Sequence, residues 1–439
     1  MATMWSGKNG GLHTRQMLFD LSRLTLFDEL SGSSPMIALN GLLESCVEEE
    51  PERAGRFFHQ MTAALHETPS RRLTGGLLQD WILYYVLEVE NLFSKCAAAQ
   101  KWDMVLYEAL KVDLGILAGL FQVSDEDIKD TISLLTKVRK QEGPLSGVVW
   151  NGDKVASVNP HRKLVSDIQP NLNLTWWSKW TYELEPVDEA DRDTLRTMAA
   201  MFCREKEWST LADELWQFHG ICGCGDFVRY RFFSFEGNLH PVVAPSGLDL
   251  SDLYGFESHK QMLIKNMLQF VNSQPHQHVL VFGKDGIGKT TLSMALMGGA
   301  ISTLRVVLMS GGMDTRQYLD LLQTLAQQPL KFILFFDDYE FSPSDYSALR
   351  RALGVVGCPN IMLYATARQA PFASLFTLNV ELEPLAKDQF VEMVSFILNK
   401  KGISMRRDRI ARNYCADIPE KSTSRMAEAV AATIVLENT

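Results

Sequence analysis

The sequence predicts an α/β fold with a parallel five-stranded sheet in the second part of the chain, preceded by a mainly α-helical region. Two observations predict this division. From Gln16 to Val138, apolar residues recur at intervals of three and four, whereas beyond Gly247 short runs rich in Val, Ile and Phe alternate with helical stretches. Helical periodicity indicates packed helices, and strand alternating with helix is typical of a parallel sheet covered on both faces.

We expect residues 1–247 to form a mainly helical N-terminal domain. Pro, Gly and Asn accumulate at 143–173, which predicts an irregular segment. Aromatic and apolar residues alternate near 226–240, which predicts a short strand segment before the boundary close to Gly247.

Residues 248–385 are predicted to form the α/β domain, and residues 386–439 a small helical lid. The five predicted strands are His278–Phe282, Leu304–Met309, Phe332–Phe336, Asn360–Ala365 and Thr377–Leu382.

Composition limits the classes of function. The 439 residues are 46% hydrophobic and 22% charged, as in soluble multidomain proteins. A net charge of −10 argues against a general nucleic-acid-binding protein, because phosphate binding needs clustered cations. The chain shows neither an apolar run long enough to span a membrane nor a signal-peptide core near its start, so we expect a cytoplasmic protein without membrane contact.

The strongest motif is a G-x-x-x-x-G-K-T pattern between a predicted strand and a predicted helix. Its backbone N–H groups and helix N-terminus favour phosphate, its lysine reaches the β- and γ-phosphates, and its threonine hydroxyl is a ligand for Mg²⁺. The sequence therefore predicts binding of ATP and Mg²⁺. The predicted binding residues are Gly283, Lys284, Asp285, Gly286, Ile287, Gly288, Lys289, Thr290 and Thr291.

Two carboxylates follow the apolar strand Phe332–Phe336, in a Walker B pattern. A strand buried on both faces presents its first polar residue at its C-terminal end, where parallel sheets bind ligands. We expect Asp337 to help hold the metal together with Thr290. Asp338 either orients the attacking water as a base or has only a structural or metal-orienting role.

The second half of the chain resembles a mostly bacterial family of predicted AAA+ superfamily ATPases that is catalogued only as a domain of unknown function. The resemblance rests on the P-loop, on Phe332–Asp338, on Tyr364-Ala365-Thr366, on Asp252-Leu253-Tyr254-Gly255 and on Arg229–Phe233 with Asn266–Phe270. It implies an AAA+ fold and ATP binding, but no established cellular role.

The resemblance also implies further site residues. Thr366 matches the polar sensor 1 position near the γ-phosphate, although the next residue, which is often polar, is Ala367. Arg368 follows and is either near the phosphates or solvated. In the lid, Arg425 matches sensor 2 or is a surface arginine, and Leu253 and Tyr254 lie where AAA+ domains hold adenine.

One departure from the family concerns hydrolysis. Relatives commonly carry an arginine finger just before a Phe-Gly pair, and the corresponding Ser374-Leu375-Phe376-Thr377 contains no Arg. Where measured, such an arginine contributes roughly 10³ to 10⁵ in rate. The absence of this arginine therefore predicts a site that binds nucleotide tightly and hydrolyses it slowly.

Three hypotheses about function follow. The first is a Mg-dependent ATPase that acts as a molecular machine or switch on a protein partner, which the helical N-terminal domain binds. This hypothesis expects no nucleic-acid partner and is compatible with a homo-oligomer. The second is an ATP-binding scaffold with little or no hydrolysis. The third, a DNA-associated loader or initiator, would use the basic lid residues from Lys400 to Arg412, which otherwise form a solvated helical face.

Overall fold

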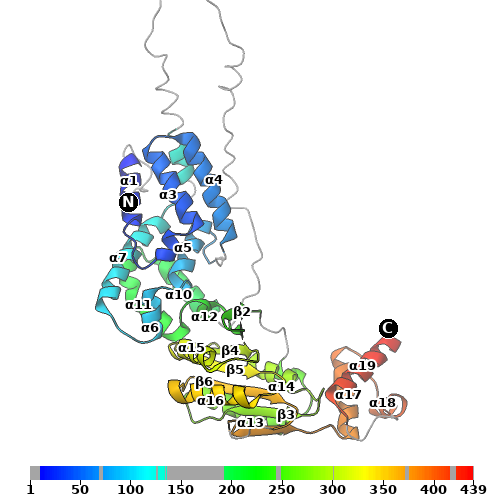
Figure 1. Cartoon of the computed structure of the whole chain (residues 1–439). Coiled ribbons are helices and arrows are strands. Elements are labelled where there is room, and N and C mark those ends of the chain that lie inside the picture. The colour runs from blue at the N-terminus through cyan, green and yellow to red at the C-terminus, as the bar shows by residue number, and fades with distance from the viewer. Residues whose placement is uncertain are drawn as a thin grey trace, which may run out of the picture. The chain divides into compact units, whose positions relative to one another are not determined.

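The computed structural model describes residues 10–68, 73–124, 127–133, 135, 192–243, 249–299, 301–370, 375–415 and 422–438. It contains two compact units (Figure 1). One comprises Met1–Ala97, Lys101–Pro186 and Thr194–Phe218, and the other comprises Ala98–Gln100, Val187–Asp193 and His219–Thr439. The expected irregular segment at 143–173 lies outside the described residues.

The first unit is helical, as its apolar periodicity predicts. Its buried side chains, such as Trp81, Leu114 and Trp208, form a core of their own. Asp113 is buried there and accepts the backbone N–H groups of Thr25 and Leu26 at 3.0 and 2.7 Å. The helices are α1 (Gly10–Leu21), α2 (Asp28–Ser31), α3 (Ser34–Val47), α4 (Pro51–Glu67), α5 (Leu77–Leu87), α6 (Leu92–Ala98), α7 (Met104–Phe121), α10 (Arg192–Arg204), the 3₁₀ turn Trp208–Leu211 and α11 (Ala212–Cys222), the last of which continues into the second unit.

The second unit is built on a seven-stranded sheet with the order β2-β1-β4-β5-β6-β3-β7. All neighbouring strands are parallel except β1 and β2, which form a hairpin. The strands are β1 (Phe232–Phe235), β2 (Leu239–Val242), β3 (Val279–Gly283), β4 (Leu304–Met309), β5 (Lys331–Phe336), β6 (Ile361–Ala367) and β7 (Leu378–Leu382). The five predicted strands are therefore present, and the sheet has two more.

The additional strands come from the segment expected to end the N-terminal domain. Phe233 of β1 pairs in parallel with Val307 of β4. Buried Arg305 of β4 anchors this edge, because its Nε donates to the carbonyl of Phe227 at 2.8 Å. Whether the chain divides into separately folding domains at 247 and 385 stays a prediction.

Helices cover both faces of the sheet. Alternate residues of β5 face opposite sides, so Leu334 packs with α15 and α16, whereas Ile333 packs with α13 and α14. Of the helical elements of this unit, α17, α18 and α19 form the lid. The bounds of these helical elements are α12 (Asp226–Arg229), the 3₁₀ turn Leu250–Asp252, α13 (Glu257–Val271), α14 (Lys289–Met297), α15 (Thr315–Ala326), α16 (Pro343–Val356), α17 (Lys387–Lys400), α18 (Arg407–Asn413) and α19 (Ser424–Asn438).

The lid has a small core of its own, to which Phe390 and Val394 of α17, Ile410 of α18 and Ala431 of α19 contribute. Among the residues that the structure describes, none of the helices combines the length and the apolar character needed to cross a membrane.

His278, directly before β3, gives the sheet a pH-dependent contact. Its Nδ1 accepts the backbone N–H of Leu363 at 3.2 Å, which requires a neutral acceptor nitrogen. Burial, with a smaller contribution from the neighbouring His276, lowers the pKa of His278 to about 4. An unfolded histidine has a pKa near 6.5, so the unfolded chain takes up the proton first as the pH falls.

We therefore expect His278 to reduce stability below about pH 6.5, by up to about 1.4 kcal/mol per pH unit, until the pH reaches about 4. Above that window its contribution is fully present. Urea unfolding of wild type and His278→Asn across this range should show a shallower pH slope for the variant. His240→Asn on exposed β2 is the matched control, and equal slopes for wild type and His278→Asn would contradict the prediction.

Candidate nucleotide-binding site

The loop between β3 and α14 has the backbone that its glycines permit. Gly286 and Gly288 have φ values of +75° and +101°, a region that side chains disfavour. A Cβ on Gly283 would lie 2.5 Å from the carbonyl oxygen of Leu382 on β7, so only glycine fits there. The loop is anchored by Ile287, which is fully buried. The free N–H groups at the start of α14 are thus presented beside the loop.

Lys289, the first residue of α14, lies over this loop. Its Nζ donates to the carbonyls of Gly283 at 2.8 Å and Lys284 at 3.3 Å. The same Nζ is 3.9 Å from Oδ1 of Asp285. The residue is 6% exposed, so its ammonium is held in one place with little solvent around its stem.

Asp337 connects three elements at the C-terminal ends of the strands. Its Oδ1 accepts the Thr290 hydroxyl of α14 and the Thr366 hydroxyl of β6, each at 2.7 Å. The Thr366 oxygen in turn accepts the backbone N–H of Asp338 at 2.6 Å. The strand order explains why the side chains of Thr290, Asp337 and Thr366 come together, because β6 lies between β3 and β5.

Asp338 has a left-handed backbone with a φ of +45°, which is uncommon for a residue with a side chain. The hydrogen bond from its N–H to Thr366 holds that conformation. The Asp338 side chain is among those that line the neighbouring cavity.

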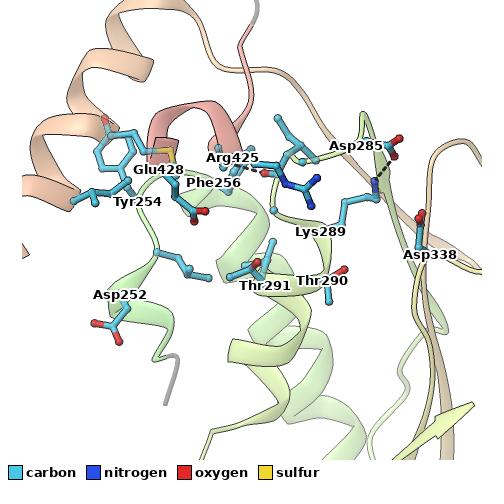
Figure 2. A pocket seen from close by; sticks show the side chains of 18 of the residues that line it. Asp252, Tyr254, Phe256, Asp285, Lys289, Thr290, Thr291, Asp338, Arg425 and Glu428 are labelled. Atoms are coloured by element: carbon cyan, nitrogen blue, oxygen red, sulfur yellow. Dashed lines mark hydrogen bonds and ion pairs between the residues drawn. The ribbon is translucent and has the colours of Figure 1, made fainter. Parts of the chain in front are cut away.

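These groups surround a cavity of about 550 Å³, a volume in the range of small-molecule sites. Figure 2 shows Lys289 and Asp285 facing each other, with Arg425 and Glu428 of the lid reaching toward the same space. The cavity is lined by Asp252, Leu253, Tyr254, Phe256, Asp285, Gly286, Ile287, Gly288, Lys289, Thr290, Thr291, Leu292, Asp337, Asp338, Arg368, Met393, Phe396, Ile397, Ser424, Arg425 and Glu428.

One end of the cavity is apolar. Leu253 and Tyr254 line it together with Phe396 of α17, and the Tyr254 and Phe396 rings have centroids 5.8 Å apart. Desolvation, and then the hydrogen bond from the hydroxyl to Glu392, raise the pKa of Tyr254 to about 12. The hydroxyl therefore stays protonated at neutral pH and ties the segment before α13 to the lid.

The lid also contacts the phosphate-binding loop directly. The backbone N–H of Arg425 donates to the Gly286 carbonyl at 3.0 Å, and the Ser424 hydroxyl donates to the Ile287 carbonyl at 2.8 Å. These bonds place the start of α19 on the loop. A shift of the loop backbone would therefore also displace the start of this lid helix.

The structure brings together most of the residues predicted from the sequence. Thr366 is an exception, since it is fully buried and its hydroxyl is used by Asp337 and Asp338 rather than presented to the cavity. Gly283 and Lys284 contribute backbone carbonyls to Lys289 instead of lining the cavity. Ser374 lies outside the described residues, and Leu375 packs against the core of the sheet.

Sequence reasoning missed several lining residues. Phe256, Met393, Phe396 and Ile397 have the apolar spacing of ordinary helix and loop cores, so no local signal distinguishes them. Glu428 lies one turn after Arg425 on α19, and that spacing was the only available clue to it.

The parallel sheet, the glycine-rich loop after β3, the carboxylates after β5 and the helical lid define a P-loop fold of the AAA+ class. Residues 226–371 match the model of a family described as "Protein of unknown function (DUF815)", which confirms the resemblance inferred from the motifs. No curated protein matched the chain.

Two solved structures with weak similarity illustrate the fold comparison. The RuvB Holliday junction branch migration motor of Thermotoga maritima is 20% identical, with 44% of this chain and 67% of that chain covered and a TM-score of 0.34. PCH-2 of C. elegans is 12% identical, with 42% and 58% covered and a TM-score of 0.27.

The three-way hydrogen bonding at Asp337 leads to a stability prediction. Thr366→Val keeps the shape of the side chain but leaves the Asp338 N–H without its acceptor, at an expected cost of about 1–3 kcal/mol in unfolding free energy. Thr366→Ser keeps the hydroxyl and should lose less. Urea unfolding of the three proteins measures the difference, and equal stability of the valine and serine variants would refute this role for the hydroxyl.

Proposed function

We propose that this protein binds ATP with Mg²⁺ and acts as an ATPase or nucleotide switch on a macromolecular partner. The observation that carries the proposal is the convergence of Lys289, Thr290 and Asp337 at one end of a single cavity. A lysine ammonium at a helix N-terminus favours the β- and γ-phosphates. A threonine hydroxyl beside a carboxylate is the oxygen donor set that Mg²⁺ prefers when phosphates complete its shell.

We propose that the nucleotide base occupies the apolar end of the cavity. Leu253, Tyr254 and Phe256 would contact its faces, together with Met393 and Ile397 from the lid. Apolar and aromatic side chains with a few polar groups are typical of such subsites. Arg425 enters the same cavity from the lid, and its guanidinium would approach the phosphates.

Two candidate functions differ in whether the bound ATP is hydrolysed. Asp338 would orient the attacking water, with Asp337 holding the metal, in a Mg-dependent ATPase. The alternative is an ATP-binding scaffold with little hydrolysis, which the packing of Leu375 into the core favours, because that position offers no cation to the site. Measuring nucleotide binding and phosphate release on one preparation separates the two.

The contacts between lid and loop support a switch. Arg425 and Ser424 bond the loop backbone, and Lys400 of α17 pairs with Asp252 beside the base end. A nucleotide that contacts both sides of the cavity would shift the equilibrium between lid positions by its differential affinity for them. We propose that the helical first unit recognises a protein partner and that the chain forms a homo-oligomer.

A DNA-associated role has less support. The net charge is −10, and Lys400 and Arg407 in the basic stretch of the lid pair with Asp252 and Glu392. Phosphate binding by a basic surface needs cations that can release counterions.

The central prediction concerns Lys289. Removing its ammonium leaves a bound polyphosphate without its buried cation, so Lys289→Ala should weaken MgATP binding at least about 30-fold, equivalent to ~2 kcal/mol or more. Titration with a fluorescent ATP analogue, with and without Mg²⁺, measures it. Lys265→Ala on the exposed side of α13 is the control. Unchanged affinity in a folded Lys289→Ala protein would rule out the proposal.

A further inference from the structure

The end of β6 carries two polar side chains that point to different places. Thr366 is buried, and both hydrogen-bonding directions of its hydroxyl are used, one toward Asp337 and one from the Asp338 N–H. Arg368, two residues further on, lines the cavity, and its side chain is 61% exposed. Of these two side chains, only that of Arg368 lines the cavity where a ligand would bind.

The Arg368 guanidinium is paired with the phosphate-binding loop. Its Nε lies 3.0 Å from Oδ1 of Asp285, and this same oxygen lies 3.9 Å from Nζ of Lys289. One carboxylate oxygen is therefore shared by two cations, one from the loop helix and one from the sheet. A phosphate group bound by Lys289 would therefore lie within reach of the Arg368 guanidinium as well.

We propose that Arg368 contacts the terminal phosphate of the bound nucleotide within the same chain, and that it exchanges Asp285 for this phosphate when ATP binds. The inference rests on the proposed ATP binding and adds to it the group that distinguishes ATP from ADP. Arginine suits the task, because its planar guanidinium forms paired hydrogen bonds with phosphate oxygens and is always charged.

The exchange is energetically accessible. Asp285 and Arg368 are both more than half exposed, and ion pairs between exposed side chains contribute little to stability. A terminal phosphate carries more negative charge than one carboxylate and offers several acceptor oxygens. The Asp285 carboxylate, in contrast, would repel it, so Asp285 is the group that opposes ATP binding at this position.

Arg368 would also take the role of the arginine finger, which is missing at position 375. In hydrolysis, a water oxygen forms a bond to the terminal phosphorus, the bond to the bridging oxygen breaks, and ADP, inorganic phosphate and a proton leave. Negative charge on the phosphoryl oxygens is stabilised by nearby cations, and Arg368 would supply one from the residue after β6 in the same chain rather than from a neighbouring subunit.

The test compares the affinities of the full chain for a non-hydrolysable ATP analogue and for ADP, both with Mg²⁺. We expect Arg368→Ala to weaken binding of the ATP analogue about tenfold and to leave ADP binding nearly unchanged, with Arg368→Lys intermediate because it keeps the charge but not the fork. Asp285→Asn should strengthen binding of the ATP analogue several-fold, and more than that of ADP, since it removes the repulsion. Arg316→Ala on exposed α15 is the control.

The outcomes separate this inference from the proposed function. A wild-type protein that binds both nucleotides, with an unchanged ratio of affinities in Arg368→Ala and Asp285→Asn, would overturn the role of Arg368 and leave ATP binding intact. A folded wild-type protein that binds neither nucleotide would overturn both. If phosphate release is measurable, its rate in Arg368→Ala should fall at least about 10²-fold, and an unchanged rate would also count against the contact.

Discussion

The carboxylate of Asp337 is the point on which the geometry of the site depends. It accepts hydroxyl hydrogen bonds from Thr290 on α14 and Thr366 on β6, and so joins the loop helix to two strands of the sheet. Hydrogen bonds to a carboxylate are among the stronger polar contacts in proteins. Because Thr290 lies on the helix that follows β3, and Thr366 lies on β6 between β3 and β5, the contact also fixes how the loop sits on the sheet.

The lid extends this arrangement to the rest of the cavity. Its helix α19 begins on the loop backbone, and α17 closes the apolar end through Phe396 and its neighbours. The bond between Tyr254 and Glu392 and the pair between Asp252 and Lys400 connect the lid to the segment before α13. A ligand in the cavity would therefore touch the sheet on one side and a separate small core on the other, which is the physical basis of the proposed nucleotide-dependent movement.

Two cations of the cavity have an acidic neighbour before any ligand is considered. Lys289 and Arg368 both lie close to Asp285, and further carboxylates, those of Asp252, Asp337, Asp338 and Glu428, also line the cavity. Binding of a polyphosphate must exchange some of these partners. Asp285 is the group most open to exchange, because it is exposed and lies in the loop itself, whereas Asp337 is held by two hydroxyls.

The sequence by itself determined the phosphate-binding loop, the carboxylates after β5 and the alternation of strands and helices, because these depend on local backbone conformation and on which residue ends a buried strand. Only the tertiary structure decided that β1 and β2 join the sheet, that the Thr366 hydroxyl turns toward Asp337, and that Arg368 meets Asp285. These features depend on the order of strands and on contacts between residues far apart in the chain, which no local pattern encodes. The apolar end of the cavity was likewise decided only by the tertiary structure, since Phe396 becomes a site residue only when the lid folds against Tyr254.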